Sequence, residues 1–233
     1  MKRRRLRLLF LFLFVVLALS VYSVTSRPEP SLPVTPSTPD IPVRTIPNPV
    51  VLIDPGHGGG DGGAVWGGVN EKDINLAIAL QLRDVLSAAG MVDVAMTRDT
   101  DVHVTATRRV EIADSVHPAL IVSIHANSFD LAYVRGVETY YRVNSEESLA
   151  VALLLHEAVL QSYRDTGHAT MDREIRPGNF RIITRPATRR AVLLEIGYLS
   201  NRDERAILTD SSFQAALAEN LAHSITLILT SRP

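Results

Sequence analysis

The 233-residue chain contains no cysteine, and this absence excludes several kinds of chemistry. No disulfide, thiolate metal site or cysteine nucleophile can form, so any bound metal must be held by nitrogen and oxygen ligands. The chain also lacks an excess of basic residues, because 24 Lys and Arg against 25 Asp and Glu leave a formal net charge of −1. Without an overall basic field to attract phosphates, we expect no nucleic-acid partner.

The small net charge conceals two regions of opposite sign. Residues 1–49 carry seven basic and two acidic side chains, a net of +5, whereas the remainder has a net of −6. Five of those basic residues lie within the first seven positions, directly before the uncharged segment 8–24. This arrangement is typical of an export segment. We therefore expect residues 1–26 to form an N-terminal hydrophobic helix, either a signal peptide or, as we favour, an uncleaved membrane anchor. Either one exports the protein, membrane-anchored or secreted.

A proline-rich segment follows the hydrophobic one. Residues 27–49 contain eight of the 13 prolines and show no helical or strand period. Such a composition favours polyproline II, so we predict a semi-rigid linker here. The remaining residues, 50–233, suffice for one domain and contain no internal repeat. We expect this single catalytic domain to be a monomer.

Short apolar runs alternate with helical periodicities along residues 50–233. Residues 50–53 form a β-branched apolar run typical of a buried strand, and residues 71–89 place apolar side chains at helical spacing until Gly90. The same patterns predict further strands at 91–97, 119–124, 134–143, 180–184 and 191–196, and helices at 105–116, 146–163 and 213–229. This alternation indicates an α/β fold, with a twisted, mostly parallel sheet covered by helices on both faces. We expect the functional crevice at the carboxyl ends of the strands.

A glycine-rich loop follows the first predicted strand, with eight of the 13 glycines within residues 56–68. Residues 58–63 fit the dinucleotide pattern G-x-G-x-x-G, but residues 64–70 separate this pattern from the predicted helix. A pyrophosphate site needs the helix to begin directly on the loop. His57 lies at the start of the loop, where neighbours without side chains let a ligand approach closely. The loop therefore indicates a ligand site at His57 rather than a nucleotide site.

Two other side chains could bind a metal together with His57. His125 directly follows the strand predicted at 119–124, which places it at the same carboxyl edge of the sheet. Glu71 shares the core-facing stripe of the helix at 71–89, where an unpaired carboxylate is costly. Two imidazoles and one carboxylate form a three-ligand zinc site with an open fourth position. The alternative is that the three residues have separate surface roles.

Glu195 is an acid within the otherwise apolar strand predicted at 191–196. Burial raises the pKa of a carboxyl group toward neutrality, as a general base and acid requires, whereas a nearby zinc ion lowers it. The alternative is a structural glutamate paired with a nearby arginine, namely Arg185, Arg189 or Arg190.

Four motifs, in chain order and over nearly all of residues 50–230, resemble the zinc-dependent N-acetylmuramoyl-L-alanine amidases. They are DPGHGG at 54–59, EKDINL at 71–76, SIHAN at 123–127 and EIGYLSN at 195–201. The segments TRDTD at 97–101 and GVETYY at 136–141 also look like that family. The resemblance implies an amidase type 3 catalytic domain with one zinc ion on His57, Glu71 and His125, and with Glu195 as the catalytic carboxylate. It implies an autolysin that faces the periplasm or cell wall and hydrolyses the amide bond between N-acetylmuramic acid and L-alanine in peptidoglycan.

Two other functions stay open at this point. A zinc peptidase that cleaves within the peptide stem would use the same open site, and a non-catalytic peptidoglycan-binding protein would need only the cleft. The sequence departs from the family where Arg190 replaces a proline that often precedes the strand carrying the second glutamate. In addition, residues 128–135 are too few for the helical insertion that blocks the zinc of some periplasmic members until an activator binds. We therefore expect no activator protein.

The remaining histidines lack the spacing of metal ligands. His156 and Glu157 begin like a metalloprotease helix, but residue 160 is Leu, so the second histidine is missing. We expect surface or core-edge positions for the others, with His168 the one that could border the cleft: His103, His117, His168 and His223.

Overall fold

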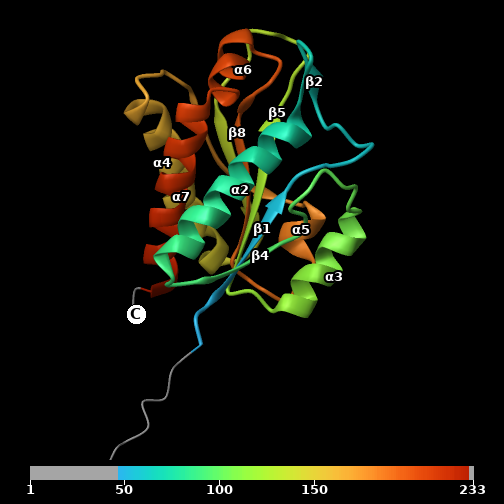
Figure 1. Ribbon diagram of the computed structural model, residues 1–233, viewed down its shortest axis with the longest axis vertical. Helices are drawn as coiled ribbons and strands as arrows, with labels where there is room; N and C mark the ends of the chain where they lie inside the picture. Colours follow the sequence, from blue (N-terminus) through green and yellow to red (C-terminus); the bar gives the residue numbers. More distant parts are fainter. Residues whose placement is uncertain (1–46, 231–233) are drawn as a thin grey trace, which may run out of the picture. The chain divides into compact units, whose positions relative to one another are not determined.

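A computed structural model describes residues 47–230 of the chain (Figure 1). The expected N-terminal hydrophobic helix within residues 1–26, and all but the end of the expected linker, lie outside the described residues. Within residues 47–230, no helix combines the length and the apolar character needed to cross a membrane.

A six-stranded sheet forms the centre of the domain, in the order β4-β1-β5-β8-β6-β7. The four strands from β4 to β8 pair in parallel, β6 is antiparallel to β8, and β7 is parallel to β6. The expectation of a mostly parallel sheet is therefore confirmed. The strands are β1 (Val50–Pro55), β4 (Asp93–Met96), β5 (Leu120–Asn127), β6 (Val137–Arg142), β7 (Asp172–Gly178) and β8 (Ala191–Tyr198).

Helices cover both faces of the sheet (Figure 1). Successive strand residues point to opposite faces, so in β8 the side chains of Val192 and Leu194 join a large core while that of Leu193 joins a smaller one. The large core lies under α2, α4 and α7, and the smaller one under α3 and α5. The helices are α2 (Glu71–Ala89), α3 (Ala106–Val116), α4 (Glu146–Asp165), α5 (Arg181–Thr184), α6 (Arg202–Leu208) and α7 (Ser211–Thr230).

The glycine-rich loop after β1 ends in a small hairpin, β2 (Val65–Trp66) and β3 (Val69–Asn70). α2 begins directly after this hairpin, at Glu71. The loop between β1 and α2 starts beside the end of β5, where the amide of Gly56 donates to the carbonyl of Ile124.

The strand predicted at residues 180–184 is wrong, because this segment forms the short helix α5. The amides of Thr184 and Arg185 donate to the carbonyls of Phe180 and Arg181, which closes a helical turn. Ile182 and Ile183 are adjacent in sequence and both buried in the smaller core. A helical turn can bury two consecutive side chains against one sheet face, whereas a strand sends them to opposite faces.

The apolar patterns missed four elements, two of which are the two-residue strands β2 and β3. The third is β7, an edge strand in which four of the seven residues are charged, namely Asp172, Arg173, Glu174 and Arg176. Charges at a sheet edge discourage pairing with another chain, but they also remove the apolar signal of a strand. The fourth is the helix α6, which has only seven residues and begins after Asn201, whose side chain accepts from the amides of Asp203 and Glu204.

Candidate functional site

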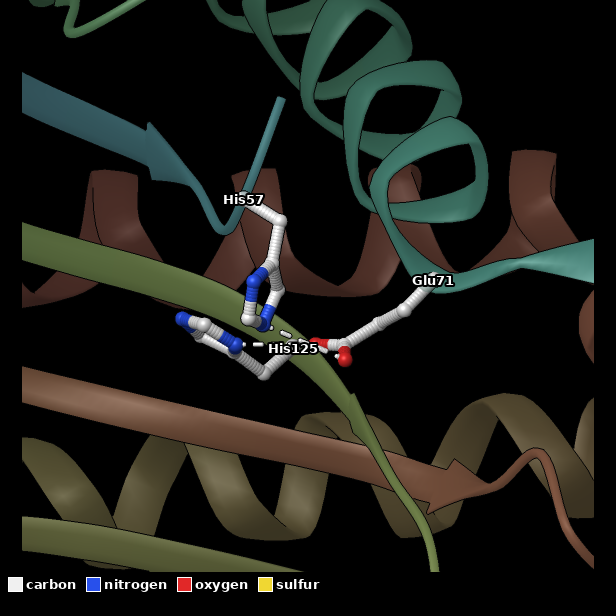
Figure 2. Close-up of side chains that lie close together, drawn as sticks. All are labelled: His57, Glu71 and His125. Atoms are coloured by element: carbon white, nitrogen blue, oxygen red, sulfur yellow. Dashed lines mark hydrogen bonds and ion pairs between the residues drawn. The ribbon is translucent and has the colours of Figure 1, made fainter. Parts of the chain in front are cut away.

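The three candidate metal ligands come from separate elements and meet at the carboxyl edge of the sheet (Figure 2). His57 lies in the loop after β1, Glu71 is the first residue of α2, and His125 lies near the end of β5. His57 Nε2 is 3.2 Å from Glu71 Oε2, and His125 Nδ1 is 2.9 Å from Glu71 Oε1. One donor atom from each residue lies within 4.8 Å of those of the other two.

Glycine is required at two points where the backbone passes these side chains. A Cβ atom on Gly56 would lie 2.2 Å from Cε1 of His125, and one on Gly63 would lie 2.5 Å from Oε2 of Glu71. Gly63 also has a φ of +64°, in the left-handed region that favours glycine. The glycines of the loop therefore make room for the donor groups.

Glu71 is 5% exposed and remains a carboxylate because of its partners. Burial by itself raises the pKa of Glu71, but hydrogen bonds from His125 and His57, together with their charges, outweigh it and hold the pKa well below its usual range. The amides of Ala64 and Ala126 also donate to this carboxylate, at 2.9 and 3.2 Å. An anionic carboxylate between two imidazoles matches the donor preference of zinc.

The ring nitrogen of His57 that does not contact Glu71, here called the outer nitrogen, is hydrogen-bonded to a second carboxylate. His57 Nδ1 is 2.9 Å from Asp61 Oδ2, on the loop itself. The hydrogen bond to Glu71 raises the pKa of His57, burial opposes it, and the contact with Asp61 adds to the rise. A carboxylate on the outer nitrogen of a histidine is the usual support of a zinc ligand, since it fixes the orientation of the ring.

Glu195 lies beside these residues in the sheet. In β8 it is the register partner of His125 in β5 and of Glu138 in β6. Its Oε2 atom is buried and has no hydrogen-bond partner within residues 47–230. Burial, and then the negative charges of Glu71 and Glu138, raise the pKa of Glu195 well above its usual value.

The alternative in which Glu195 pairs with an arginine is wrong for the described part of the chain. Arg189 pairs with Glu147 instead, and no ion pair among residues 47–230 involves Glu195, Arg185 or Arg190. The acid in this apolar strand is therefore not explained by charge pairing.

Glu138 is a buried acid next to Glu195 to which the sequence analysis assigned no role. Its two carboxylate oxygens accept hydrogen bonds from four side chains: Asn127, Tyr140, Arg173 and Tyr198. Burial raises its pKa, but these donors outweigh the effect and lower it. Glu138 therefore remains charged beside Glu195. Its sequence signal was the same as that of Glu195, an acid within an apolar and aromatic strand.

A cavity of about 570 Å³ opens on this cluster. Its lining includes His57, Glu71, His125 and Glu195, together with residues 103–106 and 180–182. The histidine that borders the cleft is thus His103, and His168 does not line it. His103 was missed because it lies in the segment between the strand predicted at 91–97 and the helix predicted at 105–116, and no other potential ligand is spaced with it in the sequence.

His156 is buried away from this cavity and has a structural role. Its Nδ1 lies 2.9 Å from Thr139 Oγ1, and its Nε2 lies 3.0 Å from Asp172 Oδ1. These contacts join α4 to β6 and to the edge strand β7. Among the described residues it belongs to no group of three or more potential metal ligands.

Comparisons with known proteins point to one enzyme family. The profile of the N-acetylmuramoyl-L-alanine amidase family matches residues 51–227. The catalytic domain of the amidase CwlV from Bacillus (Paenibacillus) polymyxa var. colistinus is 39% identical, with a TM-score of 0.73 over 79% of this chain and 99% of that one. The CwlD amidase from Clostridioides difficile, solved in complex with the GerS lipoprotein, is 29% identical, with a TM-score of 0.72 over 78% of this chain and 99% of that one.

Among curated relatives, the chain is 33% identical to an endolysin of Bacillus phage SPP1, over 77% of this chain and 66% of the endolysin. The chain thus spans just under two thirds of that relative. It is 28% identical to a germination-specific N-acetylmuramoyl-L-alanine amidase of Bacillus subtilis, over 78% of this chain and 81% of that one.

Proposed function

The chain belongs to the N-acetylmuramoyl-L-alanine amidase family, and on that basis we propose that its cavity hydrolyses the amide bond between N-acetylmuramic acid and L-alanine of peptidoglycan. We propose that one zinc ion assists, held by His57, Glu71 and His125, with Glu195 as the catalytic carboxylate. The observation that carries this proposal is the buried, unpartnered Oε2 of Glu195 in the same cavity as the three donors.

The residues present fit a zinc ion. Two imidazoles and one carboxylate are a common ligand set of catalytic zinc sites, and three protein ligands leave a position open. Gly56 and Gly63 leave space that a Cβ atom would fill, and Asp61 supports His57 from outside. When bound, zinc supplies Lewis-acid chemistry that polarises a carbonyl and makes water more acidic.

Glu195 moves the proton in the proposed reaction. Its free Oε2 accepts a proton from the attacking water, and the same carboxyl then donates it to the leaving amine of L-alanine. The raised pKa of Glu195 suits this second step, because a carboxyl group that binds its proton more tightly holds it until the leaving amine accepts it. Because water is the nucleophile, no covalent enzyme intermediate forms.

Digestion of purified peptidoglycan by the full-length protein, with and without a chelator, tests the proposal. We expect intact stem peptides with a free L-alanine amino group by mass spectrometry, loss of activity with the chelator and recovery with zinc. Shortened stems would instead identify a peptidase that cleaves within the stem. Binding of peptidoglycan without any turnover would identify a non-catalytic binding protein.

We propose that residues 1–26 export the protein and anchor it in the membrane, with residues 27–49 as a linker and residues 50–233 as a monomeric catalytic domain. The basic start and the apolar run of the sequence support this. Detection in the membrane fraction with the initial segment retained would support an anchor, and a shortened protein in the surrounding medium would support a cleaved signal peptide.

We also propose that no activator is needed to open the cavity. Of residues 128–135, only Ser128 is among those that line it. The rest of this segment is held toward α6, where Ser200 Oγ accepts from the amide of Phe129 and Asn201 donates to the carbonyl of Ala132. A purified protein that stays inert until a second protein is added would contradict this proposal.

A further inference from the structure

Arg98 connects the two chain segments that carry His57 and Glu71, and we propose that it is a positioning residue for this pair of ligands. Its Nη2 donates to the carbonyl of Gly56 at 2.8 Å and to the carbonyl of Lys72 at 2.9 Å. Gly56 directly precedes His57, and Lys72 directly follows Glu71. One guanidinium nitrogen therefore fixes the distance between the two segments. The inference rests on the proposed function for what His57 and Glu71 bind.

The burial of Arg98 and its hydrogen-bond partners favour a role in holding backbone segments together. Its side chain is 3% exposed, and none of the ion pairs found within residues 47–230 includes it. All four of its hydrogen bonds go to backbone carbonyls, the other two being those of Pro55 and Thr100. Burying a cation without a carboxylate partner costs free energy. We therefore explain the buried position of Arg98 by the backbone segments that its donors hold in place.

The planar guanidinium suits this task better than an ammonium group. Arg98 uses Nε and Nη2 on the loop before His57 and Nη2 again on the start of α2. Because these donors form a rigid fork, the positions of the carbonyls are coupled to one another. A lysine would keep the charge but could not hold both segments at a fixed separation.

Arg109 supports the same loop in a different way. Its Nη2 donates to the carbonyl of His57 at 2.7 Å, and its Nη1 pairs with Asp54. His57 has a φ of 59°, an uncommon conformation for a residue with a side chain. Arg109 thus holds one ligand segment, whereas Arg98 contacts both.

The test measures zinc binding to the full-length protein by competition with a chelating dye. We expect Arg98→Lys and Arg98→Met to weaken zinc binding by about 10–100-fold, the range seen when the supporting groups of a metal site are removed. The matched control is Arg142→Lys, because Arg142 also donates to two backbone carbonyls, those of Pro186 and Thr188, at a place remote from these ligands. The control should bind zinc as the unaltered protein does.

Two further measurements separate positioning from loss of fold. The melting temperature of zinc-free Arg98→Lys should stay close to that of zinc-free Arg142→Lys, and the visible spectrum of the cobalt-substituted protein should change in Arg98→Lys alone. Unchanged zinc affinity and cobalt spectrum in Arg98→Lys would overturn the inference, provided that His57→Ala has lost zinc. If His57→Ala binds zinc normally, the proposed ligand set fails, and the inference fails with it.

Discussion

Two histidine clusters in this domain have nearly the same local contacts. In the first, His57 and His125 lie 3.2 and 2.9 Å from the carboxylate of Glu71. In the second, His156 lies 2.9 Å from Thr139 and 3.0 Å from Asp172. The first lines a cavity and lies beside a buried carboxylate oxygen that has no partner within residues 47–230, whereas the second does not line that cavity.

The difference shows that a histidine–carboxylate contact alone does not indicate a functional site. Both contacts satisfy buried polar groups, as folded proteins generally do. Only the first cluster combines three converging donors with access from solvent and a neighbouring group whose hydrogen-bonding capacity is unused. These additional features allow ligand binding and chemistry.

The largest effect is expected at Glu195, since its unused oxygen distinguishes the first cluster most clearly. Glu195→Gln keeps the size of the side chain but removes the base, so turnover of peptidoglycan should fall by about 10²–10⁴-fold. Zinc content, measured by atomic absorption, should not change. His57→Ala should lose both zinc and turnover. A Glu195→Gln enzyme that releases stem peptides at the unaltered rate would refute the assignment.

A smaller effect, on the free energy of unfolding, is expected at Asp54. Asp54 pairs with Arg109, which in turn donates to the carbonyl of His57 in the first cluster. Burial alone raises the pKa of Asp54, but the charge of Arg109 and hydrogen bonds from Thr97 and Ser123 outweigh it, so the pKa is lowered. Asp54→Asn leaves Arg109 buried without its partner and should lower the free energy of unfolding by about 3 kcal/mol. Urea unfolding at several pH values measures this loss.

The pH dependence follows from the lowered pKa of Asp54. A carboxyl group whose pKa is lower in the folded state stabilises the fold above its unfolded pKa, near pH 4, and loses this contribution as the pH falls further. The free energy of unfolding of the unaltered protein should therefore exceed that of Asp54→Asn by about 3 kcal/mol at neutral pH. This difference should become smaller below about pH 4. Asp172→Asn in the second cluster is the control, because Asp172 is half-exposed and should cost about 1 kcal/mol or less. A pH-independent difference would contradict this account.

The smallest effect is expected at His156. His156→Ala removes two hydrogen bonds and leaves the buried hydroxyl of Thr139 without this partner, so we expect a loss of about 1–3 kcal/mol in unfolding free energy. Zinc content and turnover of the folded protein should stay unchanged, since the cluster does not line the cavity. If His156→Ala lost zinc but kept its free energy of unfolding, the second cluster would affect the metal site, and the contrast between the two clusters would be wrong.

Much of the fold follows from local patterns in the sequence. The helical spacing from Glu71 to Ala89, closed by Gly90, predicted α2 with its observed bounds, and the apolar run from Ala191 predicted β8. Such elements form where one side of a helix, or a whole strand, is buried. The apolar residues that are buried lie close together in the sequence, so their spacing predicts the element. β7 could not be found this way because an edge strand buries little and carries charges, and α5 was mistaken for a strand because a single turn is too short to show a period.

The sequence by itself determined the types of the reactive groups and the ends of the elements on which they lie. His57 and His125 were predicted from their places after strands, Glu71 from the core-facing stripe of a helix, and Glu195 as an acid within an apolar strand. Only the tertiary structure decided that Glu195 Oε2 lacks a partner within residues 47–230, that Glu138 stays charged beside it, and that Arg98 links the segments of His57 and Glu71. The physical reason is that burial and hydrogen bonding of a polar group depend on residues far along the chain, and no local pattern records which of them the fold brings within 3 Å.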